Sequence, residues 1–202
     1  MFVRSQNLFL RPAWPEDWAA ILGAVGDEAV ARNLRSVPWP YGEAEARWFA
    51  SQPQDPHYPH FLITLPKGPG GDHPGGALVG CIGLTRRQEP EGATAEFGYW
   101  IARSYWNRGY ATEAGRALLG LLPVLGHRQL VACCFRDNPA SARVLRKLGF
   151  HPTGQMALRT APARGEPAPA ATFAIDLQLG DGGDTGGDSE GNVADMAALR
   201  AA

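Results

Sequence analysis

The sequence predicts a single mixed α/β domain with a partly antiparallel sheet. Helical patterns near the amino end precede two apolar runs, 77–85 and 93–102, whose polar connection is typical of a hairpin. After Arg108 the apolar spacing changes from two residues to about 3.6, and helix and strand patterns then alternate. A length of 202 residues suits one domain with its own core.

Short strands and helices share the first 65 residues. Residues 7–11 alternate between apolar and polar side chains and end at Pro12, which predicts a strand. Pro15 and the two acidic residues after it open a segment with apolar side chains at helical spacing, which predicts a helix start. The remaining patterns predict helices at 27–34 and 43–52, a proline-rich connection, SVPWPYG, between them, and a strand at 60–65.

The second half has clearer helix signals. Asn138 suits an N-cap, Pro139 the first helical position and Gly149 the residue after a helix end, so a helix is expected between them. The other patterns predict a helix at 109–122 and strands at 128–135, 150–153 and 171–179. We expect the domain to cover residues 1–179, followed by a disordered Gly/Asp-rich tail at 180–202.

Charge and composition restrict the class of partner. The chain holds 19 basic and 20 acidic residues, which disfavours nucleic-acid or membrane-surface binding, although residues 103–164 hold 10 basic against 2 acidic ones. Three cysteines and no apolar leader suggest a reduced, cytoplasmic protein. We expect no metal site, because His57, His60 and His73 lack the regular spacing of metal ligands.

A turn around Gly109 is the strongest candidate for a binding site. It joins a predicted strand to a predicted helix, whose first N–H groups have no partner inside the helix. Gly109 allows an anion to approach the backbone closely, so a phosphate group is the expected ligand. The alternative is an ordinary tight turn before an amphipathic helix.

Three stretches, AEFGYW, RGYATEA and NPASARVLRKLGF, resemble the GCN5-related N-acetyltransferase (GNAT) family, nearest to its ribosomal-protein-alanine acetyltransferase branch, over residues 7–178. The resemblance implies a twisted, mostly antiparallel sheet flanked by helices, in which the fourth and fifth strands splay apart around acetyl-CoA. The family's pyrophosphate-binding pattern, Gln/Arg-x-x-Gly-x-Gly/Ala, falls here on residues 106–111, with Trp106 departing from it. The cofactor-binding residues implied by this turn are Arg108, Gly109, Tyr110, Ala111 and Thr112.

Glu96 is the expected proton acceptor. Amine acetylation needs a neutral nucleophile, whereas a lysine ammonium has a pKa of roughly 10.4 and an α-ammonium one of roughly 8. Strand alternation places Glu96, Gly98 and Trp100 on one face, and the small Gly98 leaves space beside the carboxylate. The alternatives are that Glu96 is a solvated strand carboxylate or that it only positions the substrate.

Asn138 and Ser141 are explained sufficiently by a helix start, which Asn138 caps and to whose first turn Ser141 belongs. The resemblance implies that both also face the pantetheine and that Ser141 hydrogen-bonds the leaving thiolate. It further implies that backbone N–H groups near Trp100 and Ile101 stabilise the oxyanion, which leaves no side-chain signature.

The sequence thus indicates an acetyl-CoA-dependent N-acetyltransferase that works by direct transfer in a ternary complex. The acceptor is an amine, either of a protein N-terminus or of a small molecule, and we expect Trp39 and Tyr41 to line its site together with the loop APARGEPAPA. The alternative is a catalytically silent acyl-CoA-binding sensor or scaffold. A monomer or homodimer is expected.

Overall fold

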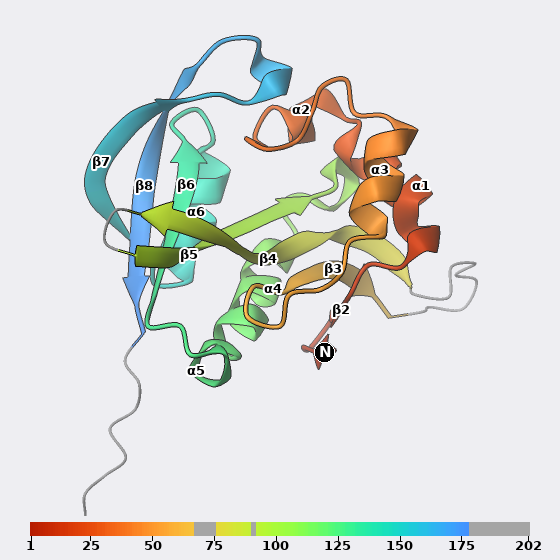
Figure 1. Ribbon diagram of the computed structural model, residues 1–202, viewed down its shortest axis with the longest axis horizontal. Coiled ribbons are helices and arrows are strands. Elements are labelled where there is room, and N and C mark those ends of the chain that lie inside the picture. Colours follow the sequence, from red (N-terminus) through yellow and green to blue (C-terminus); the bar gives the residue numbers. More distant parts are fainter. Residues whose placement is uncertain (67–75, 90–91, 178–202) are drawn as a thin grey trace, which may run out of the picture.

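The computed structural model describes residues 1–66, 76–89 and 92–177 (Figure 1). The expectations for the Gly/Pro-rich segment around His73, for the tail at 180–202 and for the domain end at 179 lie outside the described residues. No helix in the described ranges is long and apolar enough to cross a bilayer.

Within the described part of the chain the strands form one eight-stranded sheet in the order β1-β2-β3-β4-β5-β6-β8-β7 (Figure 1). Neighbouring strands of this sheet are antiparallel except β5 and β6, which are parallel. The strands are β1 (Val3–Arg4), β2 (Phe9–Arg11), β3 (His60–Leu65), β4 (Ala77–Glu89), β5 (Gly92–Ile101), β6 (Gln129–Phe135), β7 (His151–Arg159) and β8 (Ala168–Asp176).

Helices cover both faces of the sheet (Figure 1). They are the 3-10 turns η1 (Pro15–Asp17), η2 (Arg103–Tyr105) and η3 (Pro162–Arg164), and the α-helices α1 (Trp18–Val25), α2 (Glu28–Ala31), α3 (Glu43–Ala50), α4 (Tyr110–Leu119), α5 (Leu122–Leu125) and α6 (Pro139–Lys147).

The mixed α/β class and the strand at 60–65 are confirmed, and several boundaries differ. The helix predicted at 27–34 covers only Glu28–Ala31, the strand predicted at 7–11 begins at Phe9, and the strand predicted at 77–85 continues to Glu89. The helix predicted at 109–122 ends at Leu119, because Gly120 follows it, and α5 is a separate turn. The strand predicted at 150–153 continues to Arg159 as the edge strand β7, and the last strand begins at Ala168 and ends at Asp176.

Two apolar clusters lie on opposite faces of the sheet, as alternation along β3 shows. Phe61 and Ile63 belong to the large cluster shared with α4 and α6, whereas Leu62 belongs to a smaller one shared with α1 and α3. Gly115 of α4 brings the two helices of the large cluster together, because a Cβ there would lie 2.5 Å from the Leu148 side chain after α6.

The sheet opens between β5 and β6. Their ladder contains only the pairs Ala95–Leu130 and Glu96–Val131, yet β5 continues to Ile101 and β6 pairs with β8 as far as Phe135. The two strands therefore diverge beyond Glu96, and the splayed sheet implied by the family resemblance is confirmed.

A buried ion pair fixes the amino-terminal strand to the first helices. Both carboxylate oxygens of Asp17 accept hydrogen bonds from the Arg11 guanidinium at 2.7 Å, and both residues are almost fully buried. The Arg11 guanidinium also lies 3.9 Å from the ring centre of Trp14. This pair connects β2 to the start of α1.

We predict that Asp17→Ala lowers the free energy of unfolding by about 3–5 kcal/mol, because it leaves the Arg11 cation buried without its partner. Urea unfolding followed by tryptophan fluorescence measures the change. The control is Glu43→Ala, which removes the exposed Glu43–Arg47 pair and costs under about 1 kcal/mol. Equal losses in the two variants would contradict this account of the pair.

Candidate functional site

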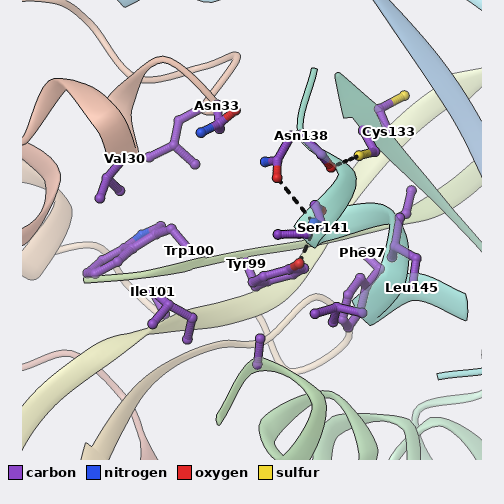
Figure 2. Close-up of a pocket in the computed structure, with 18 of the residues that line it drawn as sticks. Val30, Asn33, Phe97, Tyr99, Trp100, Ile101, Cys133, Asn138, Ser141 and Leu145 are labelled. Carbon is purple, nitrogen blue, oxygen red and sulfur yellow. Dashed lines mark hydrogen bonds between the residues drawn. The ribbon is translucent and has the colours of Figure 1, made fainter. Parts of the chain in front are cut away.

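A cleft of about 840 Å³ occupies the opening between β5 and β6 (Figure 2). It is lined by the ends of both strands, the turn before α4, the first turns of α6, and α2 with the loop that follows it. All the residues expected from the sequence to bind cofactor or to act in catalysis line this cleft: Glu96, Trp100, Ile101, Arg108, Gly109, Tyr110, Ala111, Thr112, Asn138 and Ser141.

The turn before α4 presents backbone N–H groups at one end of the cleft. Asn107 and Gly109 have φ angles of 61° and 81°, and Gly109 is the N-cap of α4. The Gly109 carbonyl accepts hydrogen bonds from the Thr112 and Glu113 N–H groups. The N–H groups of Tyr110 and Ala111 come earlier in the first turn, where a helix offers no acceptor of its own. Together with the helix dipole they form a site suited to an anion.

Trp106 stands where the family's pyrophosphate-binding pattern has Gln or Arg, and the structure explains this difference. Its indole Nε1–H donates a hydrogen bond of 2.7 Å to the carbonyl of Ile101, at the end of β5. The bond ties the turn to the end of β5 and so helps to fix the backbone of the turn.

The β4–β5 ladder determines which N–H groups of β5 face the opening. The Ala102 N–H donates to the Val79 carbonyl on β4, and alternation along an antiparallel ladder directs the N–H groups of Ile101 and Tyr99 the other way, toward the gap. The N–H of Trp100 belongs to the β4 ladder, so Trp100 lines the cleft with its side chain and Ile101 and Tyr99 supply the donors.

Tyr99 and Ser141 form a hydrogen-bonded pair beside these donors (Figure 2). The Tyr99 hydroxyl donates to Ser141 Oγ at 3.0 Å, and Asn138 Oδ1 accepts the Ser141 N–H at 3.1 Å, which confirms Asn138 as the N-cap of α6. Burial raises the pKa of the Tyr99 hydroxyl to about 12, although the Ser141 bond opposes the shift. Tyr99 is therefore protonated at neutral pH and donates, which leaves the Ser141 proton for another acceptor.

Glu96 lies on the opposite face of β5 and pairs with Arg35, from the loop after α2. The exposed fraction of the side chain is 15% for Glu96 and 34% for Arg35. Thr85 stands opposite Glu96 on β4, and its Oγ1 lies 3.5 Å from His60 Nε2. Burial lowers the pKa of His60, so the imidazole is neutral at pH 7, and Glu96 is the one carboxylate among the described residues lining the cleft.

Because the cleft crosses the sheet, both faces of β5 contribute to it. In Figure 2 the Trp100 ring lies near Val30, whereas Tyr99 reaches toward Ser141 on α6. Strand alternation separates Glu96 from Tyr99, and the break in the sheet brings both to the same opening. Tyr99 and Arg35 are two lining residues to which the sequence analysis assigned no role.

Trp39 and Tyr41 are not among the described residues that line the cleft. Tyr41 packs against the Leu62 cluster, and burial, with Glu45 and Cys81 nearby, raises its pKa to about 12. Trp39 is at the surface. The preceding part of the same loop reaches the cleft instead, through Arg35, Ser36 and Val37.

Arg164, in the loop predicted to border the acceptor, ties three segments together. Its guanidinium donates two hydrogen bonds to Asp137, at 2.8 and 2.9 Å, and Nε donates to the Arg32 carbonyl. The group also lies 3.9 Å from the ring centre of Phe135, and its hydrogen bonds to Asp137, together with its charge, hold the pKa of Asp137 below its ordinary value. The loop is thereby fixed to α6 and to the segment that carries Arg35.

The eight-stranded sheet splits between its two parallel strands, and a helix start suited to an anion lies beside the split. These two features together are typical of an acetyltransferase fold. The Acetyltransferase (GNAT) domain model matches residues 7–151, and the chain belongs to the GNAT family. It is an acyltransferase by class.

The relatives and solved structures agree with this membership. The chain is 26% identical to the uncharacterized N-acetyltransferase YnaD of Bacillus subtilis over 76% of this chain and 85% of that one. It is 38% identical to the ribosomal-protein-serine acetyltransferase of Escherichia coli over 36% of this chain and 41% of the relative, and 37% identical to YkkB of Bacillus subtilis over 38% and 45%. The chain thus spans less than half the length of these last two relatives.

Among solved structures, a GNAT acetyltransferase from Bacillus anthracis superposes with a TM-score of 0.70 at 25% identity, covering 87% of this chain and 98% of that one. A ribosomal L7/L12 α-N-protein acetyltransferase in complex with coenzyme A gives a TM-score of 0.68 at 20% identity, covering 88% and 98%. The second likeness shows that the fold is shared.

We predict that Gly109→Ala weakens coenzyme A binding about tenfold. An L side chain at a φ of 81° costs roughly 1–2 kcal/mol, and the backbone relieves this strain by a rotation that directs its N–H groups away from the ligand. Isothermal titration calorimetry measures the affinity. Gly154→Ala is the control, since Gly154 has a φ of 82° and equally open surroundings but lies in β7. It should lose stability without losing affinity, and an equal loss of affinity in both variants would refute the role of the turn.

Proposed function

We propose that this protein transfers an acetyl group from acetyl-CoA directly to a primary amine, within a ternary complex. The observation that carries the proposal is that one cleft is lined by the anion-binding start of α4, the Tyr99–Ser141 pair and the Glu96 carboxylate. Family membership supports it, because acetyltransferase names recur among the relatives.

The cofactor would lie along the α4 and α6 side of β5. The N–H groups of Tyr110 and Ala111 would bind the pyrophosphate, and the positive charges of Arg108, Arg143 and Lys147, which line the same cleft, would favour a polyanion. The pantetheine would follow the unpaired edge of β5. This arrangement brings the thioester toward Ser141.

The chemical step follows from the groups on the two sides of β5. The ammonium loses one proton to the Glu96 carboxylate, the neutral nitrogen bonds to the thioester carbonyl carbon, and the carbon–sulfur bond breaks. The second proton, which the nitrogen loses as the amide forms, goes to the departing thiolate, so coenzyme A leaves as a free thiol. The N–H groups of Tyr99 and Ile101 stabilise the negative charge that develops on the carbonyl oxygen. The departing thiolate receives a hydrogen bond from the Ser141 hydroxyl, which Tyr99 orients.

Release of free thiol from acetyl-CoA, measured over a broad panel of small amines and peptides with free N-termini, tests the proposal. Turnover of at least one amine is expected. A protein that binds acetyl-CoA and never releases thiol would be the silent sensor, and the proposal would fail. The panel also distinguishes a small-molecule acceptor from a protein N-terminus.

We predict that Glu96→Gln lowers kcat/KM for the amine by about 10²- to 10⁴-fold, because the proton acceptor is lost while the shape is kept. The affinity for acetyl-CoA should change less than twofold, since Glu96 lies on the acceptor side of β5. Steady-state kinetics and calorimetry give the two values. Glu113→Gln, in a carboxylate of α4 that binds Ser5 and Asn7, is the control and should keep its activity. Native kinetics in Glu96→Gln would rule out this role.

Tyr99 is proposed as a positioning residue that acts through Ser141. We predict that Ser141→Ala and Tyr99→Phe each lower kcat about tenfold with little change in KM for acetyl-CoA, and that the double variant loses no more than Ser141→Ala alone. Tyr105→Phe, in a cleft tyrosine near the α4 turn, is the control. Fully additive losses would show that Tyr99 acts independently of Ser141.

A further inference from the structure

The acceptor side of the cleft contains a cation paired with the proposed base. The Arg35 guanidinium donates to Glu96 Oε1, and the Glu96 side chain is only 15% exposed. The other basic side chains that line the described cleft come from the α4 turn, α6 and β7, and the nearby His60 is neutral. Arg35 and Glu96 therefore neutralise each other where the amine must arrive.

This pairing restricts which amines bind well. An ammonium that reaches Glu96 must share or replace the contact with Arg35, and a simple amine offers Arg35 nothing in return. Leaving one member of a partly buried ion pair without a partner is unfavourable. A ligand that brings an anion next to its ammonium gives a partner to each half of the pair.

The surroundings of the pair suit a compact ligand with an apolar side chain. Gly98 has open space above its Cα, since a Cβ there would meet nothing within 4 Å, so a small group can approach β5 beside Glu96. Apolar side chains from α2, the loop that carries Arg35, α3 and β5 line the same cleft: Val30, Leu34, Val37, Phe49 and Trp100.

We propose that the acceptor carries a carboxylate next to its amine and binds as a zwitterion, with its ammonium at Glu96 and its carboxylate at Arg35. An α-amino acid with an apolar side chain is the simplest such molecule. The inference rests on the proposed acetyl transfer and names its substrate class. The reaction then forms an N-acetyl amino acid and free coenzyme A: one proton of the ammonium goes to Glu96, and the second, lost as the amide forms, goes to the departing thiolate.

Three matched acceptors test the inference: leucine, leucinamide and 3-methylbutylamine, which differ in the group beside the amine. We expect kcat/KM for leucine to exceed both others at least tenfold. An amide group lowers the basicity of the neighbouring amine and so favours the neutral nucleophile, which means that a preference for leucine over leucinamide would require recognition of the carboxylate.

Two variants assign that recognition. Arg35→Gln should abolish the preference for leucine while acetyl-CoA affinity stays within twofold, which also shows that the variant is folded. Arg35→Lys should restore part of the preference, because it restores the charge without the planar fork. Arg159→Gln removes another cleft cation, on β7, and should keep the preference.

Two peptides, one with aspartate and one with asparagine at the free N-terminus, identify the source of the carboxylate. A higher kcat/KM for the aspartate peptide would indicate an acidic protein N-terminus rather than a free amino acid. Similar kcat/KM values for leucine and leucinamide, and for the two peptides, would overturn the inference and leave acetyl transfer intact. Loss of the preference in Arg159→Gln but not in Arg35→Gln would also overturn it. Absence of transfer to every amine would defeat the proposed function and this inference together.

Discussion

The ladder between β5 and β6 ends after two residue pairs, and the site depends on that ending. Backbone groups that would have been joined across the sheet, including the N–H groups of Tyr99 and Ile101, instead face a cleft. Unpaired backbone donors are costly when buried and useful when a ligand satisfies them. Because β6 continues to pair with β8, the rest of the sheet stays intact while this one gap remains open.

The gap also brings together groups from opposite faces of one strand. Glu96 lies toward the helices α1–α3, and Tyr99 lies toward α4 and α6, so an intact sheet would have kept them apart. At the opening, a donor substrate on one side and an acceptor on the other can reach the same point. Arg164 fixes the loop after α2, which carries Arg35, and the buried Arg11–Asp17 pair fixes the start of α1 to β2.

Local patterns were sufficient for most of the fold. The cap residues Asn138 and Pro139 placed the start of α6, and apolar runs placed β3 and the β4–β5 hairpin. The sequence did not predict the length of β7, because its side chains are exposed up to Leu158 and carry no apolar alternation. Arg35 left no local signal either, since its partner Glu96 is 61 residues away in the sequence. The alternation that put Glu96, Gly98 and Trp100 on one face leaves Tyr99 on the other, but only the break in the sheet shows that both faces meet the cleft.

A crystal structure with bound coenzyme A tests the central claim most directly, namely that the split between β5 and β6 holds the cofactor and directs its sulfur to Ser141. We predict pyrophosphate oxygens on the N–H groups of Tyr110 and Ala111, pantetheine along the free edge of β5, and the sulfur within hydrogen-bonding distance of Ser141 Oγ. Coenzyme A bound outside the split, or inside it with its sulfur directed away from both Ser141 and Glu96, would contradict the account.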